Sequence, residues 1–249
     1  MKALIELSRR TRITLEKEDP QAVLLTPGFV NRIPVLEEYL AGGGADIVQG
    51  LSYHFYSRAD GDLIGNVRAV QALRKKYGLE GKPFFNTESG YEGFEGPPLP
   101  GYAARDRETA AALNARAWIL GAFLGLDRWY HHGWDSTETG MVRPNGAPTP
   151  SRAAWQRVRR WLIGAEPMGC QAVNPNIVTC RLVRGEQTAW IVWRPEPAPP
   201  GEWRVPPRFE PSTAEDALTG PLPAGQWSAR TRVVRVGASP VIVWGKESP

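Results

Sequence analysis

The first 164 residues alternate between short apolar runs and longer amphipathic segments, and this alternation limits the possible folds more than any other feature. The short runs, which are typical of buried strands, cover residues 22–26, 46–56, 83–88 and 127–134. The amphipathic segments, which carry the apolar spacing or end signals of helices, cover residues 3–18, 33–40, 63–77, 106–124 and 150–164. Strands that alternate with helices predict a parallel sheet with helices packed against it, an α/β fold.

The pattern changes after Gly164. Strand-like segments without helical patterns between them follow at residues 177–183, 188–193, 227–236 and 240–244. Residues 195–211 contain seven prolines, which predicts a loop or an edge segment because proline cannot donate to a sheet ladder. We therefore predict two domains, an α/β domain at residues 1–164 and a small antiparallel β-domain at residues 165–249.

The charge and hydropathy patterns favour no nucleic-acid or membrane partner. The net charge is +4, and the basic clusters lie on helix-like segments without a nucleic-acid motif, so we interpret them as solvated helix faces. The sequence contains no signal peptide and no apolar run of membrane-spanning length. It does not predict the cellular location.

The cysteines and histidines give little support for a metal site. Cys170 and Cys180 are the two cysteines, and they fit either a disulfide across a β-hairpin or two free thiols. His131 and His132 are adjacent in a predicted strand, so their side chains point to opposite faces. We expect neither a bound metal nor a cofactor.

Polar and aromatic residues gather where the predicted strands end. His54 and Tyr56 follow the second run, Asn86 and Glu88 end the third, and Trp134 ends the fourth. Alternation along a strand places His54 and Tyr56 on one face, and likewise Asn86 and Glu88. The carboxyl ends of parallel barrel strands form active sites, so we expect these side chains to converge. There a carboxylate can attack an anomeric carbon, a tyrosine can hold it, and a tryptophan can stack on a sugar.

These residues resemble the motifs of clan A retaining glycoside hydrolases, of the β-xylosidase and α-iduronidase type or related endoglycosidases. The sequence Thr-Glu-Ser-Gly at residues 87–90 is similar to the nucleophile motif at the end of the seventh barrel strand. The resemblance implies strands five to eight of a (β/α)8 TIM barrel, a partial barrel, followed by a small β-sandwich. It also implies that Glu88 is the nucleophile and that His54, Tyr56, Asn86 and Trp134 bind substrate.

The second carboxylate of that family has no counterpart in this sequence. The acid/base glutamate follows an asparagine at the end of the fourth strand, and the alignment places Met1 just after that point. A retaining mechanism needs two carboxyl groups about 5–5.5 Å apart. Glu92, Glu95 and Glu138 are the remaining loop candidates, and they do not match the motif. We therefore expect this chain alone to be inactive or very weak, with the acid/base half absent.

Two other functions fit the same residues. One is a non-catalytic carbohydrate-binding or scaffold protein with a degenerate half barrel, and the other is a structural interaction module. The expected partner is a carbohydrate substrate, together with a missing N-terminal half-barrel or self-association. The sequence predicts neither the sugar and its linkage nor endo or exo action.

Overall fold

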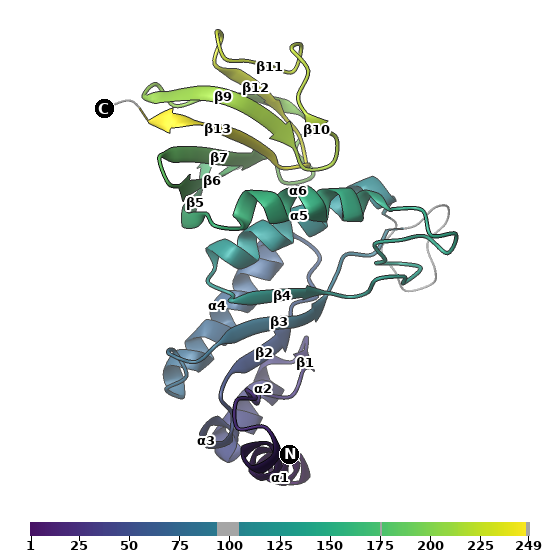
Figure 1. Cartoon of the computed structure of the whole chain (residues 1–249), viewed down its shortest axis with the longest axis vertical. Helices are drawn as coiled ribbons and strands as arrows, with labels where there is room; N and C mark the ends of the chain where they lie inside the picture. Colours follow the sequence, from purple (N-terminus) through teal and green to yellow (C-terminus); the bar gives the residue numbers. More distant parts are fainter. Residues whose placement is uncertain (94–104, 175, 248–249) are drawn as a thin grey trace. The chain divides into compact units, whose positions relative to one another are not determined.

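The computed structural model describes residues 1–93, 105–174 and 176–247. The chain divides into two compact units, one of residues 1–89 with 124–131 and one of residues 90–123 with 132–249. The fold is mixed α/β, with a parallel sheet in the first unit and antiparallel sheets in the second (Figure 1). The predicted domain boundary after Gly164 stays a proposal, because the compact units divide the chain elsewhere.

The first unit contains a four-stranded parallel sheet in the order β1-β2-β3-β4, which is the sequential order predicted. Its strands are β1 (Phe29–Val30), β2 (Leu51–His54), β3 (Phe84–Ser89) and β4 (Arg128–His131). Its helices are α1 (Lys2–Glu18), α2 (Ile33–Tyr39), a π-helical turn (Leu40–Gly44), α3 (Ala45–Ile47) and α4 (Asp60–Lys76).

Helix α4 packs its apolar side into the core of this unit. Its buried side chains, at helical spacing, are Leu63, Val67, Val70 and Leu73. The guanidinium of Arg74 lies 4.8 Å from the ring centroid of Phe84 on β3. Phe84 in turn meets Phe55 edge-on, with 5.8 Å between ring centroids. These contacts place Phe55 and Phe84 toward α4.

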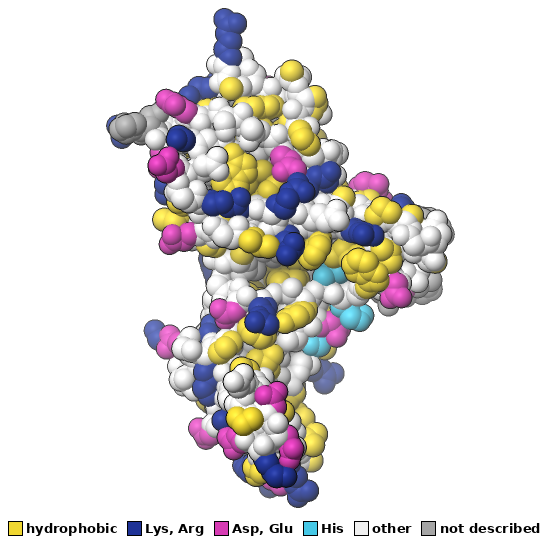
Figure 2. Space-filling view, viewed as in Figure 1, with side chains coloured by type: hydrophobic (Ala, Val, Ile, Leu, Met, Phe, Trp, Pro, Cys, Tyr) yellow, Lys and Arg dark blue, Asp and Glu magenta, His cyan; other side chains and the backbone are white. Residues whose placement is uncertain are grey.

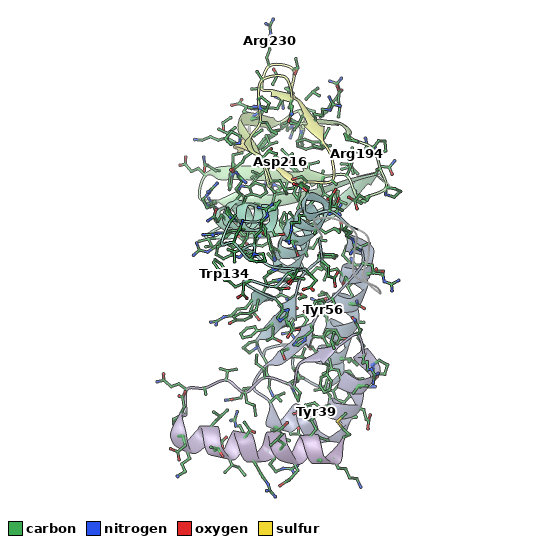
Figure 3. The ribbon with its side chains drawn as sticks, turned by 90° about the vertical axis from the view of Figure 1, so that its right-hand side faces the viewer. Tyr39, Tyr56, Trp134, Arg194, Asp216 and Arg230 are labelled. Atoms are coloured by element: carbon green, nitrogen blue, oxygen red, sulfur yellow. A yellow bond between two sulfur atoms is a disulfide. The ribbon has the colours of Figure 1, made fainter. Side chains whose placement is uncertain are left out.

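Helix α1 meets a buried tyrosine. Tyr39, at the end of α2, is fully buried and lies next to α1 (Figure 3). Burial raises the pKa of Tyr39. The tyrosine ring thus packs between α2 and the N-terminal helix as part of the core.

The predicted position of the first strand is wrong. Within residues 22–26 only Leu25 forms a bridge, with Gly50, and the strand itself is Phe29–Val30. The carbonyl of Leu24 accepts hydrogen bonds from two successive amides, Gln49 at 2.7 Å and Gly50 at 3.2 Å. Pro27 then offers no N–H to continue a regular ladder. The chain runs beside the start of β2 here without forming a strand.

The second unit contains two helices and nine strands among its described residues. The helices are α5 (Arg107–Phe123) and α6 (Pro150–Leu162). The strands are β5 (Glu166–Asn174), β6 (Ile177–Arg184), β7 (Gln187–Trp193), β8 (Gly201–Arg204), β9 (Phe209–Asp216), β10 (Gly220–Pro221), β11 (Trp227–Ser228), β12 (Val233–Val236) and β13 (Val241–Glu247). They form antiparallel sheets in the orders β10-β9-β13-β7-β6-β5 and β11-β12-β8.

One apolar core joins the two antiparallel sheets. Val192 and Val243 come from the larger sheet, and Trp203 and Val234 come from the smaller one. The β5–β6 pair carries a disulfide between Cys170 and Cys180, which lie directly opposite each other. This bond decides between the two readings that the sequence left open.

Four strands of the second unit were missed, namely β5, β8, β9 and the two-residue β10, and one predicted strand is divided. β5, β8 and β9 have weak apolar patterns, and β8 lies within the proline-rich segment at the edge of its sheet. Residues 227–236 form β11 and β12, separated by a turn in which Arg232 has a φ of 57°.

The surface carries mixed charges. On the face shown in Figure 2, basic side chains are interspersed with acidic and apolar ones. No helix in the described parts of the chain combines the length and the apolar character needed to cross a membrane.

Candidate functional site

Glu88 lies near the carboxyl end of β3 and contacts two residues from the end of β2. The register pairs Leu51 with Phe84 and Tyr53 with Asn86, so the two parallel strands end side by side. The hydroxyl of Tyr56 (labelled in Figure 3) donates a hydrogen bond of 2.9 Å to Oε1 of Glu88. The predicted pair is therefore in contact.

His54 faces the same carboxylate oxygen. Its Nδ1 lies 3.8 Å from Oε1 of Glu88, and the His54 and Glu88 side chains are 17% and 37% exposed. Within the described parts of the chain, Tyr56 and His54 are the partners of this carboxylate. Its second oxygen, Oε2, is therefore available to a ligand, while Oε1 is held.

Asn86 lies beneath this site and has no exposed surface. Its Oδ1 accepts hydrogen bonds from the Phe55 amide at 3.1 Å and the Ser89 hydroxyl at 3.0 Å. Its Nδ2 donates to the carbonyl of Tyr130 on β4 at 3.3 Å. The side chain thus connects the ends of β2, β3 and β4, and its contact with a substrate stays a prediction.

The strand alternation used for Asn86 and Glu88 does not hold here. β3 pairs with β4 through Asn86 opposite Trp129 and Ser89 opposite His131, so three steps on β3 match two on β4. Such a bulge reverses the alternation and re-aims side chains, and bulges are common beside active sites. The hydrogen bonds are consistent with different orientations of the two side chains, because Asn86 bonds to Phe55 while Glu88 bonds to Tyr56.

Trp134 belongs to the second unit, beyond the end of β4. Its side chain is 59% exposed, and the guanidinium of Arg152 on α6 lies 5.3 Å from its ring centroid. The Trp134 carbonyl accepts hydrogen bonds from the amides of Met141 and Val142, at 2.8 and 3.0 Å. Its backbone is therefore fixed and its ring is accessible, while its convergence with Glu88 stays a prediction.

The other carboxylates that we considered have partners in the second unit. Glu92 lies 3.7 Å from Arg105, and Glu138 accepts a hydrogen bond of 3.0 Å from the Ser136 hydroxyl. Glu95 lies outside the described residues. Among the residues that are described, His, Cys, Asp and Glu form no group of three or more suited to a metal ion.

Sequence reasoning missed the segment that flanks His54. Gly28 lies against the imidazole, and Thr26 is bonded to Ser52 on β2. The signal in the sequence was the dipeptide Pro27-Gly28, which directly follows the apolar run at residues 22–26.

Several solved glycoside hydrolases have a similar fold. A glycoside hydrolase family 30 endoxylanase from Clostridium papyrosolvens is 8% identical, with a TM-score of 0.63 over 98% of this chain and 60% of that one. A family 30 subfamily 8 xylanase from Clostridium acetobutylicum is 12% identical, with a TM-score of 0.58 over 97% and 59%. A β-porphyranase of family 86 from Bacteroides plebeius is 10% identical, with a TM-score of 0.63 over 100% and 52%.

The sequence itself matches no protein-family model and no curated protein. This chain spans 52–60% of the length of the three similar structures. The likeness therefore concerns the fold: the chain is mixed α/β and folds like part of a glycoside hydrolase.

Proposed function

We propose that this chain is the C-terminal half of a retaining, clan A-type glycoside hydrolase and that Glu88 is its nucleophile. The observation that carries the proposal is the contact of Tyr56 with Glu88 at 2.9 Å, at adjacent ends of parallel strands. Active sites of β/α barrels lie at this end of the strands. The similar folds of glycoside hydrolases support the same reaction class.

The geometry around Glu88 suits nucleophilic attack. The Tyr56 hydroxyl holds Oε1, and Oε2 has no hydrogen-bond partner among the residues that the structure describes. A fixed carboxylate loses little freedom when it attacks an anomeric carbon, which lowers the barrier. Glu88 then forms a glycosyl ester, and the leaving group departs with the bonding electrons. His54 contacts the same oxygen and supports its orientation.

The architecture in this proposal is a partial barrel with an appended domain. The strands β1 to β4 correspond to strands five to eight of a (β/α)8 barrel, in a domain that covers residues 1–164. The two antiparallel sheets correspond to a β-sandwich domain at residues 165–249. A complementary half-barrel, or a second copy of this chain, is the partner that would cover the exposed face of the parallel sheet.

The acid/base carboxylate in this proposal belongs to that complementary half. Glu92 and Glu138 are engaged elsewhere, and neither follows an asparagine at a strand end. General acid catalysis contributes about 10²–10⁴-fold to such reactions. This chain alone should therefore release only very good leaving groups, and then remain as the glycosyl ester because no base activates water.

The test is incubation with a panel of dinitrophenyl glycosides, followed by intact mass measurement. We expect a burst of dinitrophenolate of at most one equivalent, with a mass increase of one glycosyl group on Glu88. Glu88→Gln should abolish the adduct, and Glu80→Gln, which alters an exposed carboxylate in the same unit, should leave it unchanged. An adduct that survives Glu88→Gln contradicts the nucleophile assignment. Turnover of natural oligosaccharides shows that the chain contains an acid/base group after all.

The exposed ring of Trp134 favours a second candidate, carbohydrate binding without catalysis. A flat apolar ring with a guanidinium on it offers a stacking surface and charged donors to a sugar. In that case oligosaccharides bind with no adduct on Glu88, and Trp134→Ala removes binding. Loss of binding in Glu88→Gln but not in Trp134→Ala would exclude this candidate.

A further inference from the structure

Gly28 lies against the imidazole of His54 at a distance that only a glycine permits. A Cβ atom built on Gly28 falls 2.4 Å from Nε2 of His54 and 2.9 Å from its Cε1. Contacts this short are far inside van der Waals separation. The space beside the backbone of Gly28 is therefore occupied by the imidazole ring.

The backbone on this side of the ring is anchored. The hydroxyl of Thr26 donates to the carbonyl of Ser52 at 2.9 Å and accepts from the Ser52 amide at 2.9 Å. The hydroxyl of Ser52 donates to the carbonyl of Thr26 at 2.8 Å. Both residues are buried, so breaking these bonds would leave unpaired polar groups away from water. The segment that contains Gly28 is bonded to β2, so moving its backbone away from the His54 ring would break these hydrogen bonds.

The opposite side of the ring faces the candidate nucleophile. Nδ1 of His54 lies 3.8 Å from Glu88, whereas Nε2 is the atom nearest to Gly28. The imidazole therefore lies between a fixed backbone and the carboxylate. Its position depends on the absence of a side chain at residue 28.

We propose that Gly28 is a positioning residue, which makes room for the His54 imidazole and thereby holds Nδ1 of that ring beside the Glu88 carboxylate. The role of this contact in catalysis rests on the proposed function, but the placement of the ring does not. Gly28 does not have a positive φ, so alanine fits the backbone conformation there. An added methyl group therefore displaces the ring, which rotates about two side-chain bonds, and leaves the anchored backbone in place.

The experiment is NMR of the full chain with isotope-labelled histidine, which gives ring signals from three residues only. His54→Ala assigns the His54 signals. Gly28→Ala should shift them and abolish the nuclear Overhauser contact between the ring and residue 28. Gly81→Ala is the matched control, because residue 28 is crowded whereas no atom lies within 4 Å of a Cβ at residue 81. It should leave all three histidines unchanged.

The coupling to Glu88 is measured in the same spectra. Glu88→Gln should shift the His54 ring signals in the natural background, and this response should be lost in Gly28→Ala. If Gly28 were needed only for a contact other than the one with His54, the His54 signals would still shift on Glu88→Gln in the Gly28→Ala background. Unchanged His54 signals in a folded Gly28→Ala protein, or a retained response to Glu88→Gln, would overturn the proposal.

Loss of folding in Gly28→Ala is resolved by a second variant. If the ring is what the methyl group meets, Gly28→Ala in the His54→Ala background should fold as well as His54→Ala alone. A double variant that stays unfolded would show that the backbone, not the ring, requires glycine, and the proposal would fail. These outcomes do not depend on glycosyl transfer, so they are distinct from a failure of Glu88 to form an adduct.

Discussion

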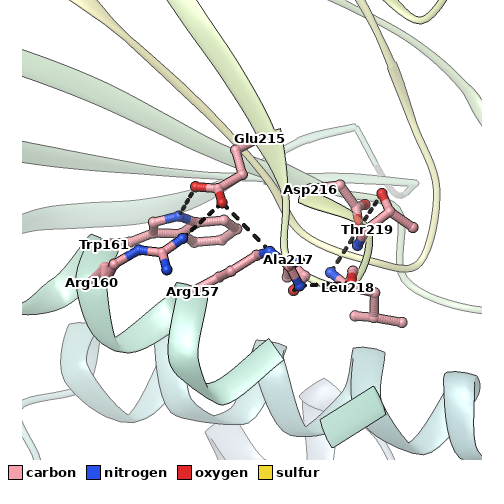
Figure 4. A network of polar contacts seen from close by, with 8 residues as sticks. All are labelled: Arg157, Arg160, Trp161, Glu215, Asp216, Ala217, Leu218 and Thr219. Atoms are coloured by element: carbon pink, nitrogen blue, oxygen red, sulfur yellow. Dashed lines mark hydrogen bonds and ion pairs between the residues drawn. The ribbon is translucent and has the colours of Figure 1, made fainter. Parts of the chain in front are cut away.

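Replacing Glu215 by alanine should destabilise the second unit by about 3 kcal/mol, because one carboxylate joins helix α6 to strand β9 (Figure 4). The indole N–H of Trp161 donates to its Oε2 at 2.8 Å, and Arg160 donates to its Oε1 at 3.0 Å. Arg157 also lies 3.5 Å from Oε1. All three donors come from α6, and the acceptor comes from the six-stranded sheet.

The magnitude follows from the burial of each donor. Trp161 is 2% exposed, so its N–H would lose its partner without gaining water, at a cost of about 1–3 kcal/mol. Arg160 is exposed, and such a surface pair contributes about 0–1 kcal/mol. Arg157 keeps hydrogen bonds to the carbonyls of Ala217 and Leu218, so its loss is small. The buried indole therefore provides most of the effect.

Denaturant unfolding of the full chain is the assay, with the transition of the second unit followed by hydrogen exchange in β9 and β13. Glu215→Gln is the matched variant, because its amide oxygen still accepts the indole N–H while the charge is lost. It should cost about 1 kcal/mol, and Trp161→Phe should make Glu215→Gln and Glu215→Ala more nearly equal. Equal costs for the two Glu215 variants with Trp161 present would refute the reasoning.

Three further predictions concern other parts of the chain. Replacing both Cys170 and Cys180 by alanine should lower the free energy of unfolding by up to about 3 kcal/mol, because the disulfide closes a loop with a sequence separation of 10. Calorimetry measures this change, and an unchanged melting temperature would contradict the prediction. The Thr109 amide donates to the Asp106 side chain at 2.6 Å and lowers the pKa of Asp106 from its ordinary value of 3.8, so the stabilisation by the ionised Asp106 is present above pH 3.8 and is lost as the pH falls through the folded-state pKa. Asp106→Asn should therefore weaken the acid dependence of the free energy of unfolding, and a pH profile identical to that of the natural chain would contradict the prediction. The parallel sheet has Tyr130 exposed on an edge strand, whereas parallel sheets are normally covered on both faces. We therefore expect sedimentation to show concentration-dependent association, and a monomer that binds no hydrophobic dye would contradict this expectation.

The order of the parallel strands was predictable because each run of apolar residues and its helix form a local unit. Right-handed crossovers of short length then leave few alternatives to a sequential sheet. The helices α4 and α6 follow their apolar spacing and end signals closely. The antiparallel strands β5 and β9 were missed because β5 is exposed on both faces and β9 carries three charged residues, so neither shows strict alternation.

The contacts of the candidate site were predictable only in part. The pair Tyr56 and Glu88 followed from parallel strand ends, and its hydrogen bond agrees with that expectation. The burial of Asn86 did not follow, because a bulge depends on how two strands pair and leaves no mark in one strand's sequence. The contact of Gly28 with His54 joins residues 26 positions apart, and local pattern rules do not reach such a distance.

The features that were missed are those that fix the site. Tyr56 lies beyond the last residue of β2, where a side chain would ordinarily be free to move. The side-chain oxygen of Asn86 accepts hydrogen bonds from the backbone amide of Phe55, one residue before Tyr56, and from the side-chain hydroxyl of Ser89, one residue after Glu88. One buried side chain therefore contacts the neighbours of both members of the Tyr56–Glu88 pair. We therefore expect replacement of Asn86 to disturb the positions of Tyr56 and Glu88 together, because its three hydrogen bonds connect the ends of β2, β3 and β4.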